Sequence, residues 1–124
     1  MEYEDKGAGP VVLFLHGWQN DLRSFDYLVA LLSPAYRIIR LDLPGFGGTE
    51  TPKSVWNLDN YIRFVGDFIQ KLKISPDFLV GHSFGGRIII KGNAIGKIPA
   101  SKIILISSAG VTKNRAFLGL ILKA

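Results

Sequence analysis

The stretch FLVGHSFGGRII, residues 78–89, places one serine between two glycines, directly after one apolar run and directly before another. The run before the serine predicts a buried strand over 78–82, and the run after it predicts a helix. A Gly-x-Ser-x-Gly pattern at such a junction indicates a sharp turn that strains the backbone of Ser83 and presents its hydroxyl outside the fold. We expect Gly81 and Gly85 to approach each other across this turn. The alternative interpretation is a glycine-rich turn whose serine only caps the helix.

Outward from this junction, strands and helices alternate along the whole chain. Further strands are predicted at 11–15, 37–43 and 102–107, and helices are predicted to begin near Leu22, after Asn57 and at Ala116. This alternation predicts one α/β domain, a mostly parallel sheet with helices on both faces. In such sheets, ligands bind outside the carboxyl ends of the strands.

Composition restricts the possible classes of protein. The 124 residues are 48% hydrophobic and 20% charged, which is typical of a globular chain. There is no cysteine, so disulfides and thiolate–metal sites are excluded, and neither a metal site nor a cofactor is expected. No apolar run reaches the ~18–20 residues of a membrane span, and the polar opening EYEDKGAG does not resemble a secretory signal. A cytoplasmic location is therefore expected.

The charges are distributed unevenly along the chain. All ten acidic residues lie within the first 77 positions, whereas residues 78–124 hold seven basic residues and no acid. These bases are scattered through apolar segments rather than clustered with aromatic residues, as a nucleic-acid interface would have them. We interpret them as solvated faces and do not expect a nucleic-acid partner.

A second motif bears on the chemistry of Ser83. Attack of its hydroxyl on an acyl carbon would create an oxyanion, which needs preorganised N–H donors. The backbone N–H of Phe84, at the start of the predicted helix, is one candidate donor. The loop after the first strand opens with His16, Gly17 and Trp18, where Gly17 permits close approach and Trp18 offers its own amide.

Three motifs together resemble a known family. LFLHGW (13–18), RLDLPGFGGT (40–49) and LVGHSFGG (79–86), in this order and spacing, are similar to the amino-terminal half of α/β-hydrolase fold proteins over roughly residues 1–115. The resemblance implies Ser83 as nucleophile, Trp18 and Phe84 as oxyanion hole, and a small-molecule acyl substrate.

The resemblance further implies a sheet in which the strands at 37–43, 11–15, 78–82 and 102–107 lie side by side in that order. A serine at the elbow, rather than an aspartate, speaks against the dehalogenase and epoxide-hydrolase branches. Esterases, lipases, thioesterases, carbon–carbon bond hydrolases and cofactor-free perhydrolases remain open, and an esterase-like enzyme is the leading interpretation.

The sequence departs from the family pattern after Ser83. The family's triad runs serine, acid, histidine, but no histidine follows Ser83 and no acid follows Asp77. We therefore interpret residues 1–124 as a single truncated core, with 111–124 as the start of a cap or linker. This chain alone is expected to be inactive.

The remaining candidate residues receive structural interpretations. His82 adjoins Ser83 but neighbouring side chains diverge at such a turn, so it is not expected to act as a base. His16, placed at the mouth of the site, is expected to pin its loop by hydrogen bonds, and Asp42 is expected to order the PGFGG turn. Three aromatic residues are candidates either for lining an acyl pocket or for core packing: Trp18, Phe46 and Trp56.

Two alternatives to a complete serine hydrolase remain. One is a non-catalytic binding module that has lost the triad, and the other is one part of a two-chain hydrolase. The resemblance also implies that the strand at 102–107 is internal in the family, so in this truncated chain it would leave an unpaired apolar edge. We therefore expect self-association, or pairing with the missing carboxy-terminal half.

Overall fold

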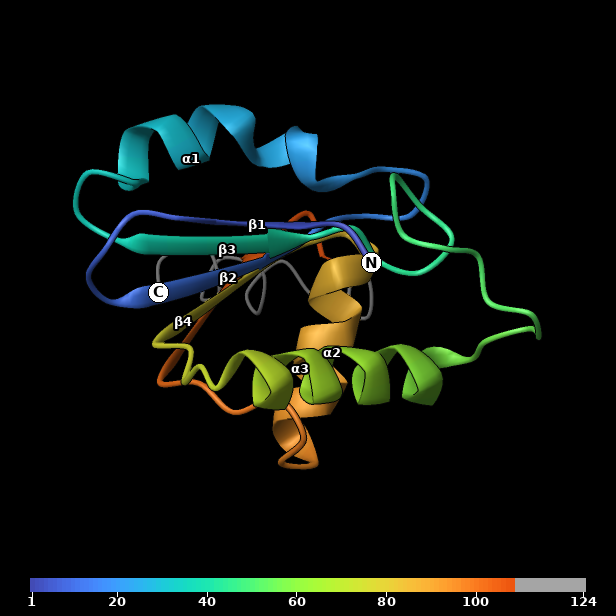
Figure 1. Ribbon diagram of the computed structural model, residues 1–124. Helices are drawn as coiled ribbons and strands as arrows, with labels where there is room; N and C mark the ends of the chain where they lie inside the picture. The colour runs from blue at the N-terminus through green and yellow to red at the C-terminus, as the bar shows by residue number, and fades with distance from the viewer. Residues whose placement is uncertain (109–124) are drawn as a thin grey trace.

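The computed structural model describes residues 1–108, and the structure shows five strands and four helical segments there (Figure 1). The predicted helix at Ala116 and the predicted cap or linker at 111–124 lie outside this part. The strands are β1 (Tyr3–Lys6), β2 (Val11–Leu15), β3 (Arg37–Leu41), β4 (Phe78–His82) and β5 (Lys102–Ile106). The helical segments are the 3₁₀ turn η1 (Leu22–Phe25), α1 (Asp26–Leu32), α2 (Leu58–Leu72) and α3 (Phe84–Ala94).

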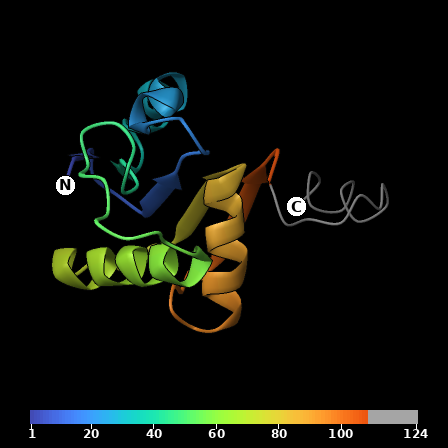
Figure 2. The same ribbon diagram turned by 90° about the vertical axis from the view of Figure 1, so that its right-hand side faces the viewer.

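The strands form one mixed sheet in the order β1-β3-β2-β4-β5. β3, β2, β4 and β5 are parallel neighbours, which confirms the predicted order of these four strands. Helix α1 covers one face, whereas α2 and α3 cover the other and cross each other there (Figures 1 and 2). The predicted α/β fold with helices on both faces is confirmed.

Strand β1 was not predicted from the sequence. It pairs antiparallel with β3, so that Tyr3 lies opposite Leu41. Its sequence, YEDK, has no apolar alternation because most of its side chains are exposed. Arg37 on β3 forms an ion pair of 2.7 Å with Asp5. A short, charged strand of this kind protects the edge of a sheet from unwanted pairing.

Helix α2 contributes five buried side chains to the larger of the two apolar cores. Asn57 caps it, and its side chain and that of Asn60 each accept a hydrogen bond from the other residue's backbone N–H. The predicted apolar stripe is buried against the sheet, except for a half-buried Leu72; its buried members are Tyr61, Ile62, Val65, Phe68 and Ile69. The second core lies between α1 and the opposite face of the sheet.

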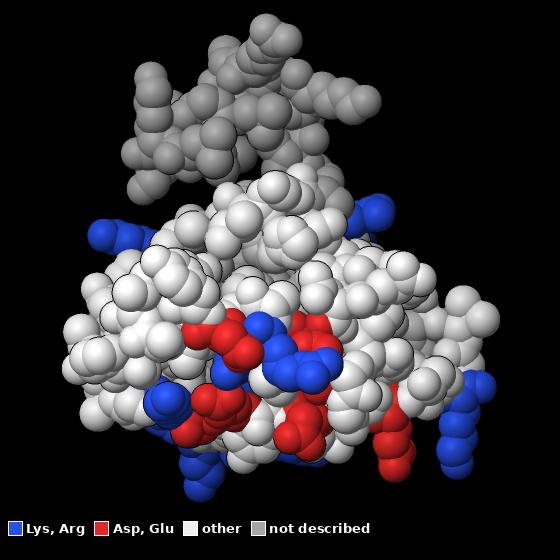
Figure 3. Space-filling model, turned by 90° about the horizontal axis from the view of Figure 1, so that it is seen from above, with Lys and Arg blue, Asp and Glu red and all other residues white. Residues whose placement is uncertain are grey.

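The α1 side of the molecule carries charges of both signs next to one another (Figure 3). Arg40 is almost completely buried there and donates to Glu4, to Asp26 and to the carbonyl of Leu22. This arginine therefore ties β1, β3 and the start of the first helical segment together.

Between residues 1 and 108, no helix is long and apolar enough to cross a membrane.

Candidate functional site

Ser83 sits at the junction of β4 and α3 in a strained conformation. Its φ of 50° and ψ of −112° lie in a region that residues with a side chain rarely adopt. The backbone N–H of Ser83 donates to the Ile106 carbonyl of β5, and its own carbonyl accepts from Arg87. The serine hydroxyl makes no capping hydrogen bond to α3. The sharp turn is thus as predicted, and the alternative of a serine N-cap does not hold.

Glycines surround this turn because neighbouring backbone leaves no room for side chains. A Cβ on Gly81 would lie 2.6 Å from the Cα of Gly86, and a Cβ on Gly85 would collide with the carbonyl oxygen of Leu15. The chain thus approaches itself closely across the turn as expected, and Gly86, the residue after Gly85, makes the nearest contact with Gly81. Helix α3 begins directly after Ser83, so its third residue, Gly86, faces Gly81, whereas Gly85 faces the end of β2.

The loop after β2 lies beside the serine. β2 pairs directly with β4, with Leu15 opposite Gly81. A Cβ on Gly17 would lie 3.2 Å from the Cβ of Ser83 and 2.9 Å from Nδ1 of His82. The structure therefore brings together the loop at 16–18 and the turn at 81–85, as predicted.

Two backbone amides near Ser83 are available to a ligand. In the described part of the chain, neither the N–H of Trp18 nor that of Phe84 donates to a protein acceptor. The amide of Phe84 opens α3, whose N-terminus carries partial positive charge. These two groups are suited to bind a developing negative charge, which is the chemistry that the sequence predicted for them.

His16 is fully buried, so the expectation that it lies at the mouth of the site is wrong. Its Nε2 accepts a hydrogen bond of 2.9 Å from the backbone N–H of Leu43. Nδ1 must then carry the proton, which it donates to the Gly17 carbonyl at 2.7 Å. Burial lowers the pKa of His16 below its ordinary value. Both ring nitrogens are occupied, so His16 pins its loop as predicted and cannot serve as a base.

The buried neutral state of His16 predicts a pH-dependent stability. Below about pH 6.5, the unfolded chain binds a proton that the folded chain excludes, so the free energy of unfolding falls by up to about 1.4 kcal/mol per pH unit. A His16→Gln variant keeps an acceptor for Leu43 but does not titrate. We expect it to be less stable than wild type at pH 7.5 and to lose less stability between pH 7.5 and 5.5.

Urea unfolding at both pH values measures this difference. Equal losses of stability in the two proteins would show that His16 is not held neutral by its surroundings.

His82 and Asp42 are the other two polar candidates, and neither is placed to act as a base on Ser83. Among residues 1–108, neither His16 nor His82 forms a hydrogen bond with Ser83. Asp42 is buried and accepts from the backbone N–H of Leu22 at 2.7 Å and from that of Gly48 at 2.8 Å. The predicted role of Asp42 in ordering the PGFGG turn is confirmed, and the same carboxylate also anchors the start of η1.

An aromatic pocket lies next to the turn. A hollow of about 340 Å³ is bordered by Trp18, Phe46, Trp56 and Tyr61. Trp18 is 56% exposed, so core packing is not its role, whereas Phe46 and Trp56 are half-buried. No residue of the turn at 81–85 is among the described residues that line the hollow, but the ring of Phe84 contacts Trp18 at a centroid distance of 5.2 Å.

Tyr61 belongs to this site although the sequence placed it only in the core. Its ring lies 5.2 Å from that of Phe84 and 5.2 Å from that of Trp56. Its hydroxyl donates to the Pro44 carbonyl at 3.2 Å, and burial raises its pKa. The one cue in the sequence was the hydroxyl group that Tyr61 brings to the first position of an otherwise apolar helical stripe.

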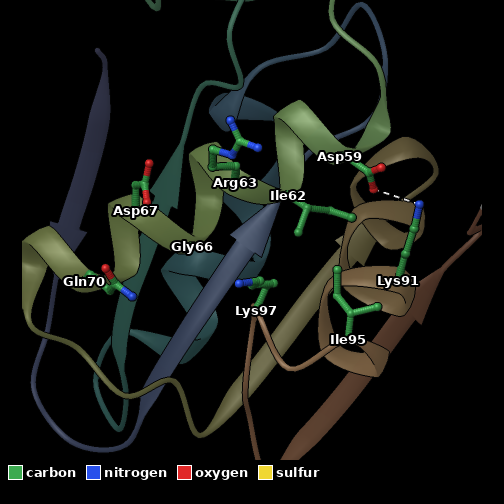
Figure 4. A pocket seen from close by; sticks show the side chains of 9 residues that line it. All are labelled: Asp59, Ile62, Arg63, Gly66, Asp67, Gln70, Lys91, Ile95 and Lys97. Carbon is green, nitrogen blue, oxygen red and sulfur yellow. Dashed lines mark ion pairs between the residues drawn. The ribbon is translucent and has the colours of Figure 1, made fainter.

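A separate groove of about 490 Å³ runs between α2 and α3 (Figure 4). Lys91 and Asp59 form an ion pair of 2.7 Å across it, and both side chains are exposed. Exposed side chains of both signs line the groove, and none of its nine residues belongs to the serine turn or to the loop at 16–18.

In the described part of the chain, no group of three or more potential ligands could hold a metal ion.

A parallel sheet that carries a strained serine at the carboxyl end of a central strand, beside a glycine-containing loop, defines a class of hydrolytic folds. Residues 12–123 match the alpha/beta hydrolase family, and the chain belongs to this family. It is 32% identical over 113 residues to the uncharacterized hydrolase YugF of Bacillus subtilis, a match that covers 90% of this chain and 41% of YugF.

Other relatives differ in what they act on. The chain is 31% identical over 87 residues to the 2-(acetamidomethylene)succinate hydrolase of Mesorhizobium japonicum, covering 70% of this chain and 31% of the relative. Among solved structures, a bacterial membrane phospholipase A has a TM-score of 0.84 at 26% identity, covering 98% of this chain and 41% of that one. The chain thus spans about two-fifths or less of the length of these proteins.

Proposed function

We propose that Ser83 is the nucleophile of a serine hydrolase that cleaves a carboxylic ester or a related acyl bond in a small molecule. The observation that carries this proposal is the strained serine at the end of β4 with two unengaged backbone amides near it. Backbone strain of this kind costs about 1–3 kcal/mol and persists where the surroundings enforce it. The similarity to a phospholipase A supports an ester as the bond that is cleaved.

In the proposed reaction, the Ser83 hydroxyl oxygen attacks the acyl carbon and loses its proton to a base. The carbonyl oxygen becomes an oxyanion, which the amides of Trp18 and Phe84 bind. The leaving alcohol takes the proton from the base, and water then hydrolyses the acyl ester on Ser83 by the reverse sequence. This chain supplies the nucleophile and the oxyanion donors in that scheme.

The base and its acidic partner must come from elsewhere. His16 is occupied at both nitrogens, and no histidine follows Ser83 in the 124 residues. We propose that both groups belong to polypeptide beyond these residues, in the same chain or in a second one. The lack of a histidine in this region also favours the second candidate, a binding module that keeps the pocket without the chemistry.

A fluorophosphonate probe tests the proposal, because it labels a serine that has a base and an oxyanion hole. A longer protein that continues beyond Ala124 should be labelled, and Ser83→Ala should abolish the label. The 124-residue chain should react at least roughly 10³-fold more slowly than the longer protein, because its serine lacks a base.

Ser101→Ala is the matched control, because Ser101 is exposed and precedes β5. This variant should be labelled like wild type. Labelling that survives Ser83→Ala would assign the nucleophile elsewhere. A folded longer protein that is not labelled at all would favour the binding module.

A further inference from the structure

Within residues 1–108, the walls of the aromatic pocket beside the serine turn carry no charge. Ten of these residues line the hollow, and none of the ten is acidic or basic: they are Trp18, Gln19, Pro44, Gly45, Phe46, Thr51, Pro52, Ser54, Trp56 and Tyr61. The hydroxyl of Tyr61 is engaged by the Pro44 carbonyl. The pocket therefore offers aromatic faces and edges together with a few neutral polar groups.

The rings of the pocket hold one another in edge-to-face geometry. Trp18 contacts Phe46 at a centroid distance of 4.8 Å, and Trp56 contacts Tyr61 at 5.2 Å. Contacts of this kind contribute about 0.5–1.5 kcal/mol each beyond the burial of their area. The walls are thus built by mutual packing before any ligand enters, which favours a preformed site.

The pocket is connected to the serine through the residues next to Gly17 and Ser83 in the chain. Gly17 lies against Ser83, and the next residue, Trp18, forms part of the pocket rim. On the other side, Phe84 follows Ser83, and its ring contacts both Trp18 and Tyr61. A group held by Ser83 would therefore have this hollow as its neighbouring apolar space.

We infer that this pocket binds the uncharged part of the substrate, an aromatic or compact apolar acyl group, and rejects acyl groups that carry a carboxylate. This inference rests on the proposed function for its placement in catalysis. Its physical basis is independent of catalysis: a carboxylate entering the hollow would lose water without meeting a cation, which is costly. A neutral ring would meet four aromatic side chains instead.

The chain carries its own reporter for this inference. It has two tryptophans, Trp18 and Trp56, and both line the pocket. Their fluorescence can be titrated with phenylacetamide and with phenylacetate, which share a ring and differ in charge. We expect saturable changes with phenylacetamide in the millimolar range, as for a ligand of this size. Phenylacetate should bind at least about tenfold more weakly.

A substitution on the pocket wall should change this preference. Thr51 is exposed and lines the hollow, so Thr51→Arg adds a cation there without disturbing the core. We expect this variant to bind phenylacetate at least about tenfold more tightly than wild type does. Val55 is 99% exposed in the same segment and does not line the hollow, so Val55→Arg is the matched control and should leave both affinities unchanged.

Three outcomes would overturn the inference. They are equal binding of the two probes by wild type, no saturable signal from phenylacetamide in a folded chain, and equal effects of Thr51→Arg and Val55→Arg. Titrations at about 0.15 M salt limit the long-range effect of the added charge. The proposed function is tested separately by covalent labelling, so charge selectivity in a chain whose Ser83 does not react would leave the pocket assigned and the chemistry rejected.

Discussion

Gly85→Ala should destabilise the folded chain by about 3 kcal/mol or more. The added methyl group would collide with the backbone of Leu15 and approach the carbonyl oxygen of His16 within 2.7 Å. Backbone in a central strand cannot move aside as a flexible side chain can, so the cost reaches the upper range for overpacking or beyond it. In a domain with only about 5–15 kcal/mol of stability, this loss is a large fraction of the total free energy of unfolding.

Gly96→Ala is the appropriate control for this substitution. Gly96 has a φ of +75°, but no atom lies within 4 Å of a Cβ built on it. Its replacement should therefore cost only about 1 kcal/mol, for the unfavourable backbone conformation alone. Urea unfolding followed by circular dichroism compares the two, and equal losses would show that the packing of α3 against β2 is looser than the structure indicates.

The described chain should self-associate through strand β5. β5 pairs with β4 on one side, and no strand within residues 1–108 pairs with its other side. Ile104 is 46% exposed and borders an apolar hollow of about 120 Å³ on the same face as α1. An unpaired apolar edge recruits other strands. We expect light scattering at ~100 μM to give at least about twice the mass of 13.7 kDa.

Ile104→Lys should return the chain toward a monomer, because a charged residue on an edge strand opposes pairing. Val55→Lys adds the same charge at a fully exposed loop position and should leave the association unchanged. A wild-type chain that stays at 13.7 kDa and unfolds cooperatively would contradict the expectation. That result would mean that the chain itself covers this edge.

Most of the sheet could be predicted because its buried strands are continuous apolar runs. The segments at 11–15 and 78–82 are bounded by turn residues, so their type and their approximate ends are readable from local sequence. β1 could not be found in this way, because YEDK has no apolar pattern. Its pairing depends on β3, more than thirty residues away, through contacts such as that of Arg37 with Asp5.

The site was predicted where a motif fixes local geometry and missed where tertiary packing decides. The strain at Ser83 follows from a pattern of five residues, and the structure has it. The anchoring of His16 depends on Leu43, 27 positions later, whose backbone N–H donates a hydrogen bond to Nε2 of the ring. Tyr61 joins the pocket through packing with distant residues, such as the hydrogen bond from its hydroxyl to the carbonyl of Pro44, 17 positions earlier. No local pattern reports such distant neighbours.

The backbone of Ser83 also has an evolutionary consequence. A glycine at this position would adopt a φ of 50° freely, so a lineage under selection for stability alone would gain about 1 kcal/mol from that single change. Genetic drift in a chain without use for the hydroxyl would therefore tend to replace the serine. Under the proposed function, the strain at Ser83 is the cost in stability of placing an oxygen atom at this position, and the fold itself does not need it.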